Sequence, residues 1–217
     1  MTPRPALIYH LCAALHCRLY RRVALALALL CTLPAFAQSS IMQSSLARVG
    51  DPAPSFTLSS IDGRKVSLAD FRGKYVVLEW WNSECYAVNI HYGAGAMQAA
   101  QRQARADGTV WLSIDSTHPA HPSFVDAKRS QAMLKQWKGN QTALLQDTDG
   151  RTGRAYGAVV TPHTYVIDPA GTLIYSGAID DQRAMREVRK ARNLALAALG
   201  EARGGKPVSR PLTQAYG

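Results

Sequence analysis

Residues 75–81 constrain the fold of this chain more than any other segment. They read Tyr-Val-Val-Leu-Glu-Trp-Trp, and such a run of β-branched and aromatic residues is typical of a strand buried on both faces of its sheet. Three polar residues later a helical pattern begins at Cys85, and it continues to about Ala106 before Asp107 and Gly108 end it. A buried strand that leads directly into a long helix predicts an α/β fold.

The flanking segments predict the remaining elements. Short alternating runs at 56–58 and 66–68 enclose Asp62 and Gly63, a pair that tolerates the positive φ of tight hairpin turns, so an N-terminal β-hairpin is expected. Two prolines make residues 118–122 a loop. This order of elements predicts a mixed sheet with helices on both faces. Further strands are expected at residues 110–114, 142–146, 163–168 and 172–176, and further helices at residues 123–138, 151–156 and 180–199.

The first 37 residues have the pattern of a secretory signal. They contain four arginines and no acidic residue, and an apolar run at 23–33 precedes Pro34 and a cut after Ala37. A membrane anchor is the weaker interpretation, because a spanning helix needs about 20 apolar residues. We therefore expect export, to the periplasm, with no integral membrane segment after cleavage. The expected organisation is a signal peptide at 1–37, a flexible lead-in at 38–48, one domain at 49–200 and a C-terminal tail at 201–217.

Removal of a signal peptide would change the cysteine count of the chain. Three of the four cysteines, Cys12, Cys17 and Cys31, lie in that segment, so Cys85 alone would remain. Pairs of cysteines in exported proteins usually form disulfides. A single leftover cysteine is instead a reactive thiol or an intermolecular partner. Cys85 is therefore the first candidate for the chemistry of this protein.

The formal net charge of +10 is carried by two parts of the chain. Four arginines belong to the predicted signal peptide, and residues 183–210 hold eight basic and two acidic residues, which leaves residues 38–182 neutral overall. A basic helix can contact anionic lipid or nucleic acid. A solvated helix face is the favoured interpretation here, and export argues against nucleic acid as a partner.

Cys85 stands at the predicted start of a helix, where the chemistry of a thiol changes. The first N–H groups of a helix lack backbone partners and carry a partial positive charge. Both favour the thiolate, which is the form that attacks a peroxide oxygen or a disulfide sulfur. Asn82, just before the helix, is expected to hydrogen-bond near the thiolate or to cap the helix. No metal is expected at His118 and His121, because no third ligand is evident.

Four separate segments, in the expected order, resemble the alkyl hydroperoxide reductase/thiol-specific antioxidant superfamily. They are residues 49–58, Gly63 with residues 68–74, residues 79–85 and residues 161–168. The resemblance covers residues 49 to about 182. It implies a thioredoxin-like three-layer sandwich, with a mixed central sheet, helices on both faces and an N-terminal β-hairpin.

The same resemblance implies roles for residues outside the helix of Cys85. Thr161 and Pro162 would form a cis-proline loop that faces the cysteine and offers backbone groups to an extended substrate. His163, next in the chain, is expected either to stabilise the thiolate or to be a half-exposed strand residue.

The chain departs from the motifs of the better-known branches of this superfamily. Exported thiol–disulfide oxidoreductases have Cys-x-x-Cys, whereas Val88 stands at the fourth position here. Typical peroxiredoxins have Pro-x-x-x-Thr-x-x-Cys, and here Leu78 and Asn82 occupy the proline and threonine positions. Cys85 thus matches the first cysteine of the Cys-x-x-Cys pattern and the single cysteine of the peroxiredoxin pattern.

Less-studied redoxin-like relatives resemble the chain more closely. They have Trp-x-Asn-x-x-Cys, then proline, then His-Tyr some residues on, and this chain matches apart from Tyr86 in place of the proline. The matching residues are Trp80, Asn82, Cys85, His91 and Tyr92. In those relatives a second cysteine often follows a Tyr-Gly pair like Tyr216 and Gly217, so the resolving thiol is either absent here or follows Gly217.

These observations predict an exported thiol-dependent oxidoreductase with antioxidant or peroxidase-like activity through Cys85. Its substrate would be a peroxide or a disulfide, and an external thiol reductant or redox partner protein would restore the cysteine. No cofactor is expected. Two alternatives stay open: a redox-inactive thioredoxin-fold binding module, and a thiol–disulfide exchange protein that forms mixed disulfides with a partner.

Overall fold

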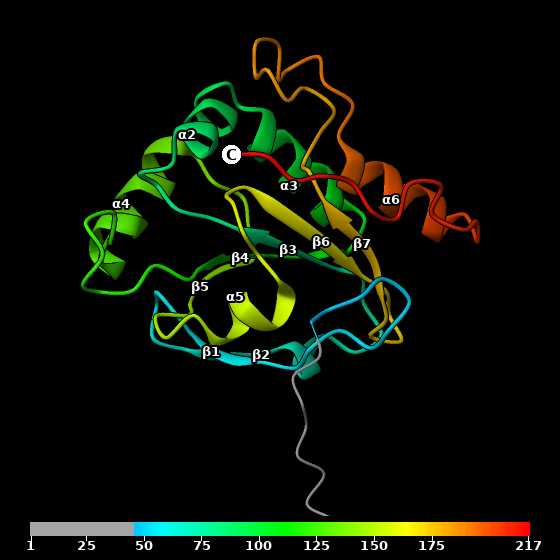
Figure 1. Ribbon diagram of the computed structural model, residues 1–217, viewed down its shortest axis with the longest axis horizontal. Coiled ribbons are helices and arrows are strands. Elements are labelled where there is room, and N and C mark those ends of the chain that lie inside the picture. Colours follow the sequence, from blue (N-terminus) through cyan, green and yellow to red (C-terminus); the bar gives the residue numbers. More distant parts are fainter. Residues whose placement is uncertain (1–45) are drawn as a thin grey trace, which may run out of the picture. The chain divides into compact units, whose positions relative to one another are not determined.

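The segment at 75–81 forms the central strand of a mixed sheet in the computed structural model, which describes residues 46–217 (Figure 1). This strand is β3 (Val76–Trp80), and all its residues are buried. The other strands are β1 (Thr57–Ser60), β2 (Lys65–Ser67), β4 (Val110–Asp115), β5 (Ala143–Gln146), β6 (His163–Ile167) and β7 (Leu173–Gly177). Their order across the sheet is β2-β1-β5-β4-β3-β6-β7. β3 pairs in parallel with β4 and antiparallel with β6.

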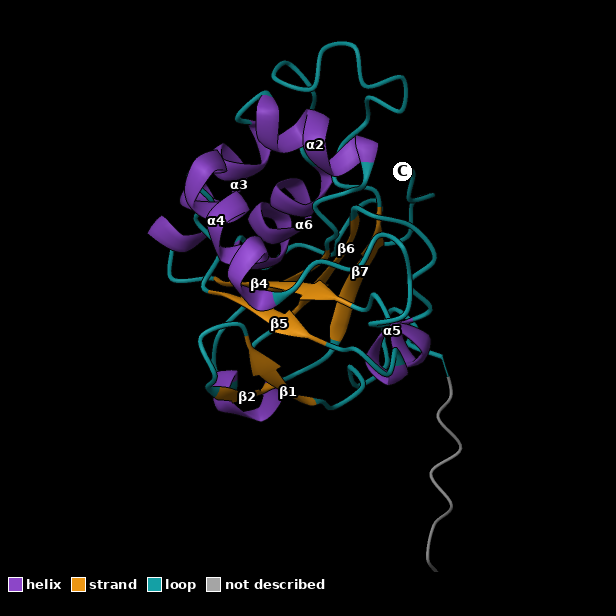
Figure 2. Ribbon diagram, turned by 90° about the vertical axis from the view of Figure 1, so that its left-hand side faces the viewer, coloured by secondary structure: helices purple, strands orange, loops and turns teal. Residues whose placement is uncertain are grey.

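Helices lie on both faces of the central strands, as the sequence predicts (Figure 2). On one face lie α2 (Tyr86–Gly93), α3 (Ala96–Ala106), α4 (Ala127–Trp137) and α6 (Leu194–Arg203). On the other face lies α5 (Arg151–Tyr156), and the short helix η1 (Leu68–Phe71) follows β2. The mixed α/β sandwich with an N-terminal hairpin is therefore confirmed. The predicted signal peptide and residues 38–45 of the predicted lead-in lie outside the described residues.

Alternate side chains of the central strands enter two separate cores, because successive residues of a strand point to opposite faces. Val77 and Trp111 belong to the core beneath α2, α3, α4 and α6. Leu78, Leu112 and Tyr156 belong to the core on the side of α5. Burial on both faces explains the unbroken apolar character of β3 in the sequence.

The long helix expected from Cys85 to Ala106 is interrupted. α2 ends at Gly93 and α3 begins at Ala96. Gly95 adopts a φ of 77°, in the left-handed region that favours glycine, and this residue redirects the chain between the two helices. The start of the next helix also differs from the prediction: Asp126, rather than Ser123, accepts a hydrogen bond from Arg129 N and caps α4.

The helix expected at 180–199 is wrong in its first half. Residues 181–193 form turns and a loop, and α6 begins only at Leu194, capped by Asn193. The two aspartates that suggested a helix start instead close this loop, because Asp180 accepts from Gln182 N and Asp181 accepts from Arg192 N.

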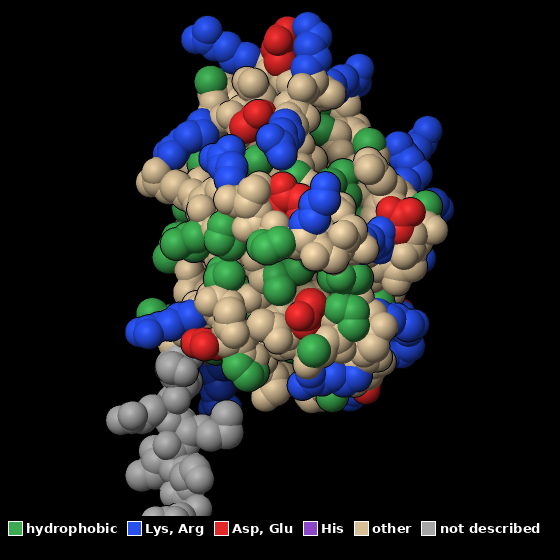
Figure 3. All heavy atoms as spheres, turned by 90° about the vertical axis from the view of Figure 1, so that its right-hand side faces the viewer, with side chains coloured by type: hydrophobic (Ala, Val, Ile, Leu, Met, Phe, Trp, Pro, Cys, Tyr) green, Lys and Arg blue, Asp and Glu red, His purple; other side chains and the backbone are tan. Residues whose placement is uncertain are grey.

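The basic residues of this loop are exposed to solvent. In Figure 3, Lys and Arg side chains gather at the top of the molecule, the end at which Figure 1 shows the loop. The positive charge expected on one helix face therefore lies mostly on a loop. Within residues 46–217, no helix has both the length and the apolar character needed to cross a membrane.

Candidate active site

Cys85 lies where the chain leaves the end of β3 and enters α2. It is the N-cap residue of α2, with φ and ψ of −75° and 127°, and its side chain makes no capping hydrogen bond. Its carbonyl accepts the first helical bond, from Asn89 N, at 3.0 Å. The side chain is half-buried, and Cys85 is the cysteine that the described part of the chain contains. The helix N-terminus predicted for this residue is confirmed.

Thr161 faces the sulfur of Cys85 across the site. The Cys85 Sγ–H donates to the carbonyl oxygen of Thr161 at 3.1 Å, a bond between residues 76 positions apart in the sequence. The peptide bond between Thr161 and Pro162 is cis, and Pro162 is buried. The structure therefore brings together Cys85 and the Thr161-Pro162 loop, although their catalytic roles stay predictions.

Asn82 is buried and connects three segments around the site. Its Nδ2 donates to Thr117 Oγ1 at 2.6 Å and to the carbonyl oxygen of Ser123 at 3.2 Å. Its Oδ1 accepts from Glu84 N at 2.7 Å. These bonds hold the turn before Cys85 against the loop that follows β4. Asn82 does not cap α2, because Cys85 is its N-cap residue, and a role of Asn82 near the thiolate stays a prediction.

His163 is the first residue of β6, and its side chain is buried. Its ring stacks on Tyr165 with centroids 4.5 Å apart, and its Nδ1 is 3.2 Å from the Tyr165 hydroxyl. Its Nε2 is 3.5 Å from Ser176 Oγ on β7. Burial lowers the pKa of His163 to about 4, so the ring is neutral near pH 7. The His163 ring thus interacts with Tyr165 and with Ser176 of β7, and a role of His163 toward the thiolate stays a prediction.

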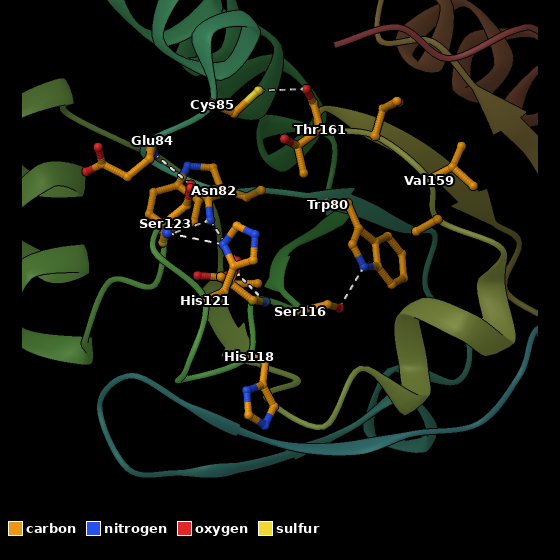
Figure 4. A pocket seen from close by; sticks show the side chains of 15 residues that line it. Trp80, Asn82, Glu84, Cys85, Ser116, His118, His121, Ser123, Val159 and Thr161 are labelled. Carbon is orange, nitrogen blue, oxygen red and sulfur yellow. Dashed lines mark hydrogen bonds between the residues drawn. The ribbon is translucent and has the colours of Figure 1, made fainter.

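A cavity of about 540 Å³ opens beside Cys85 (Figure 4). Figure 4 shows Cys85 and Thr161 at one end and His118 at the other. No Lys or Arg of the described residues lines this cavity. Its walls include Trp80, Asn82, Cys85, His121, Val159 and Thr161.

The polar groups in the cavity walls bond mainly to one another. Trp80 Nε1 donates to Ser116 Oγ at 3.0 Å, and Ser116 Oγ donates to Asp147 Oδ2 at 2.6 Å. Asp115 Oδ1 accepts from the backbone N and the hydroxyl of Thr117 at 2.9 and 2.5 Å. Burial raises the pKa of Asp115, against these two bonds, which lower it. The walls are thus largely pre-organised.

His118 and His121 are exposed and border the cavity. Each Nδ1 accepts a backbone N–H, from Ala120 and from Ser123, both at 3.1 Å. A neutral ring in this arrangement carries its proton on Nε2. Among residues 46–217, no group of three or more His, Cys, Asp or Glu side chains is placed to hold a metal ion.

Glu79 is a buried polar centre that the sequence reading did not single out. It lies on β3, six residues before Cys85, and its side chain is fully buried beneath α2 and α3. Its carboxylate accepts from Trp111 Nε1 at 2.7 Å, Ser113 Oγ at 3.1 Å and Tyr92 at 3.1 Å. Burial raises its pKa to about 7, against these bonds, which lower it. The sequence signal that could have identified Glu79 is a charged residue inside an otherwise apolar predicted strand.

His91 belongs to a second buried polar cluster. Its Nδ1 is 3.7 Å from Asp180 Oδ2, and its Nε2 is 3.5 Å from the hydroxyl of Tyr216, which also donates to Asp180 Oδ1. Burial lowers the pKa of His91, although the charge of Asp180 acts in the opposite direction. The cluster joins α2, the end of β7 and the C-terminal residues.

The mixed sheet with helices on both faces, with a half-buried cysteine at a helix N-terminus beside the loop that enters β6, has the architecture of a thioredoxin-fold protein. The chain belongs to the AhpC/TSA family, whose sequence model matches residues 49–176. The resemblance inferred from the four sequence segments is therefore confirmed.

Curated relatives include both thiol–disulfide oxidoreductases and peroxiredoxins. The chain is 25% identical over 159 residues to the thiol-disulfide oxidoreductase ResA of Bacillus subtilis, covering 72% of this chain and 83% of that protein. It is 27% identical over 157 residues to the chloroplastic peroxiredoxin Q of Populus jackii, covering 70% and 72%.

Solved structures share the fold. A putative thiol:disulfide interchange protein DsbE from Chlorobium tepidum superposes with a TM-score of 0.52 and 28% identity, covering 72% of this chain and all of that one. A hypothetical protein from Sinorhizobium meliloti superposes with a TM-score of 0.65 and 23% identity, covering 79% and 91%.

Proposed function

We propose that this protein is an exported thiol-dependent oxidoreductase that works through Cys85 alone. The observation that carries the proposal is the position of this half-buried sulfur, at the N-terminus of α2, opposite Thr161 and open to a cavity. The sulfur stands at a helix start, where the first N–H groups lack backbone partners. Val88, one helical turn on, cannot resolve a disulfide, and in the proposed reaction the second thiol comes from another molecule.

Disulfide exchange is the reaction that the site supports best. The Cys85 thiolate attacks one sulfur of a disulfide, a new S–S bond forms, and the other half leaves as a thiolate that takes up a proton. An external thiol then attacks the substrate sulfur of this mixed disulfide and releases Cys85. In the net reaction, the external thiol takes the place, in the substrate disulfide, of the half that left in the first step.

Exposed apolar side chains favour a protein as the disulfide substrate. Tyr86, next to the cysteine, is 73% exposed, and Val159, on the cavity wall, is 79% exposed. Exposed large apolar residues beside a reactive group are typical of contact surfaces. We therefore propose that the substrate is a disulfide-bearing protein rather than a small disulfide.

Peroxide reduction is the second candidate, favoured by the family of the chain and by the open cavity at the sulfur. The thiolate would attack a peroxide oxygen, the O–O bond would break, and Cys85 would become a sulfenic acid while water or an alcohol leaves. Two external thiols would then regenerate the cysteine, releasing water and forming a disulfide between them. Among residues 46–217, no Lys or Arg lines the cavity to stabilise the leaving oxygen, so we expect this reaction to be the slower one.

Mass spectrometry of the reduced protein tests both reactions. We expect bis(2-hydroxyethyl) disulfide to add half of itself to Cys85, and hydrogen peroxide to give a sulfenic acid that a dimedone probe traps more slowly. Cys85→Ser is the control and should give neither product. Failure of Cys85 to react with either reagent, with partner binding intact in Cys85→Ser, would overturn the proposal in favour of a redox-inactive binding module.

Export rests on the pattern of residues 1–37. We expect protein recovered from the periplasmic fraction of an expressing bacterium to begin at Gln38. Recovery of the chain with an intact Met1 from the cytoplasmic fraction alone would contradict this part of the proposal.

A further inference from the structure

Residues 211–217, which we call the strap, pack along the outer edge of β7. Ser176 N donates to the carbonyl oxygen of Pro211, and Thr213 N donates to that of Ser176, both at 3.0 Å. Leu212 and Ser176 form a parallel bridge. The strap thus continues the sheet by a few backbone hydrogen bonds beyond its last strand.

Thr213 fastens the strap to the turn that follows β7. Its hydroxyl accepts from Ala178 N at 3.0 Å and lies 2.7 Å from the hydroxyl of Tyr175. Gly177 leaves the room for this contact, because a Cβ at that position would overlap Thr213. The strap is therefore fixed by side-chain bonds as well as by the backbone pairing.

Tyr216 fastens the far end of the strap to the helix of the active-site cysteine. Its ring is 7% exposed and belongs to the core beneath the helices. Its hydroxyl donates to Asp180 and lies 3.5 Å from His91 Nε2 on α2. The strap is thereby connected to α2, which begins at Cys85.

Gly217 lies directly on the backbone of Thr161. A Cβ at position 217 would overlap the carbonyl oxygen of Thr161 and come within 2.8 Å of its carbonyl carbon. The same carbonyl oxygen accepts the Sγ–H of Cys85. In Figure 4 the red ribbon of the C-terminal residues ends near Thr161. Only a residue without a side chain permits so close an approach.

Thr161 offers an unpaired backbone N–H at the site, among the described residues. It precedes β6, and its N–H has no hydrogen-bond partner among the described residues. An unpaired backbone N–H is a group with which the backbone of an extended peptide can pair. Such a peptide would carry its disulfide to the sulfur of Cys85.

We propose that the strap is an intramolecular cover of Thr161, and that an extended segment of a protein substrate must displace its end to reach Cys85. This inference deepens the proposed function and rests on it. The strap selects by size: a small disulfide reaches the sulfur through the open cavity, whereas a peptide that needs the backbone of Thr161 competes with Gly217. Lifting the strap accelerates the peptide reaction alone.

Gly217→Ala is the variant that lifts the end of the strap, because its methyl group cannot fit against Thr161. Gly200→Ala is the matched control, since a Cβ there meets nothing within 4 Å. Tyr216→Phe removes the hydroxyl bond to Asp180 and keeps the ring in the core. The net loss of about 1 kcal/mol for one hydrogen bond corresponds to a roughly fivefold rise in the open population.

The test compares two rates of mixed-disulfide formation at Cys85: with bis(2-hydroxyethyl) disulfide, and with an extended peptide whose cysteine is activated by thionitrobenzoate. We expect Gly217→Ala and Tyr216→Phe to raise the peptide rate about fivefold or more and the small-disulfide rate less than twofold. An unchanged or lower ratio of peptide to small-disulfide rate in both variants would overturn the inference.

Affinity for the unactivated peptide separates this inference from the proposed function. In a Cys85→Ser background no redox step occurs, and fluorescence anisotropy reports peptide binding alone. We expect Gly217→Ala to tighten binding about fivefold or more there, while Gly200→Ala leaves it unchanged. If Cys85 proves unreactive yet this tightening is seen, the proposed function fails and the cover stands; if Cys85 reacts and binding does not tighten, only the cover fails.

Discussion

The side chains of Cys85 and Glu79 stand six residues apart and have opposite surroundings. Cys85 is half-buried beside an open cavity, whereas Glu79 is enclosed beneath α2 and α3 by hydrogen-bond donors. Burial disfavours the charged carboxylate more than those donors favour it. Glu79 therefore titrates close to neutral pH, and its charge enters the stability of the fold.

Replacement of Glu79 by glutamine should remove a pH dependence from the free energy of unfolding. The pKa of Glu79 is about 7 in the folded chain against an ordinary value of 4.5, so the folded state binds the proton more tightly. The stability this proton gives is fully present below pH 4.5 and is lost as the pH rises to 7, by roughly 3 kcal/mol. Urea unfolding between pH 4.5 and 8 measures the change.

Glu84→Gln is the control for this series, because Glu84 is exposed and pairs with Arg129 at the surface. Its stability curve should run parallel to that of the unmodified protein within about 0.5 kcal/mol. If the stability curve of Glu79→Gln also runs parallel to that of the unmodified protein, the Glu79 carboxylate is already ionised in the folded chain between pH 4.5 and 8.

At the scale of elements, the site depends on loops held together by side chains rather than by the sheet. The turn before α2 and the loop after β4 meet through Asn82, and the loop at 181–193 closes through Asp180 and Asp181. Neither set of bonds follows helix or strand periodicity. This is why the predicted helix starts at Ser123 and Asp180 were wrong.

Asn82→Ala should loosen the cavity wall more than it unfolds the domain. The variant loses the bonds to Thr117 and Ser123 and leaves these half-buried partners unsatisfied, which costs about 1–3 kcal/mol. Limited proteolysis should cut first within residues 117–125, and urea unfolding should show the loss. Asn140→Ala, whose side chain bonds the exposed Arg105, should change both readouts little; equal effects of the two variants would contradict the connecting role of Asn82.

At the scale of the whole molecule, the C-terminal residues are part of the folded domain rather than a free tail. Tyr216 contributes to the core beneath the helices, far in sequence from the other residues there. Tyr216→Ala should cost about 3–5 kcal/mol, the range for loss of a buried aromatic side chain. Leu212→Ala, at a residue 72% exposed on the same strap, should cost less than about 0.5 kcal/mol in the same urea titration.

A comparable loss in Tyr216→Ala and Leu212→Ala would mean that the strap is bound along its edge and not through the core. Either result is independent of the redox state of Cys85, because both variants are compared in the presence of reductant.

Much of the fold was predictable because its signals are local. The run at 75–81 became β3, Asp62 and Gly63 formed the hairpin turn between β1 and β2, and the helix start at Cys85 followed from the polar residues before it. The break at Gly95 was missed because both halves of the segment have helical composition. A single left-handed residue redirected the chain there.

The sequence by itself determined which elements form and which cysteine heads the first core helix, since both depend on periodicity over a few neighbouring residues. The tertiary structure decided what surrounds that cysteine. It placed Thr161 against the sulfur, stacked the His163 ring on Tyr165, and brought Gly217 onto Thr161. These contacts join residues tens of positions apart, and no local pattern specifies them, because they arise only when the sheet order has been set.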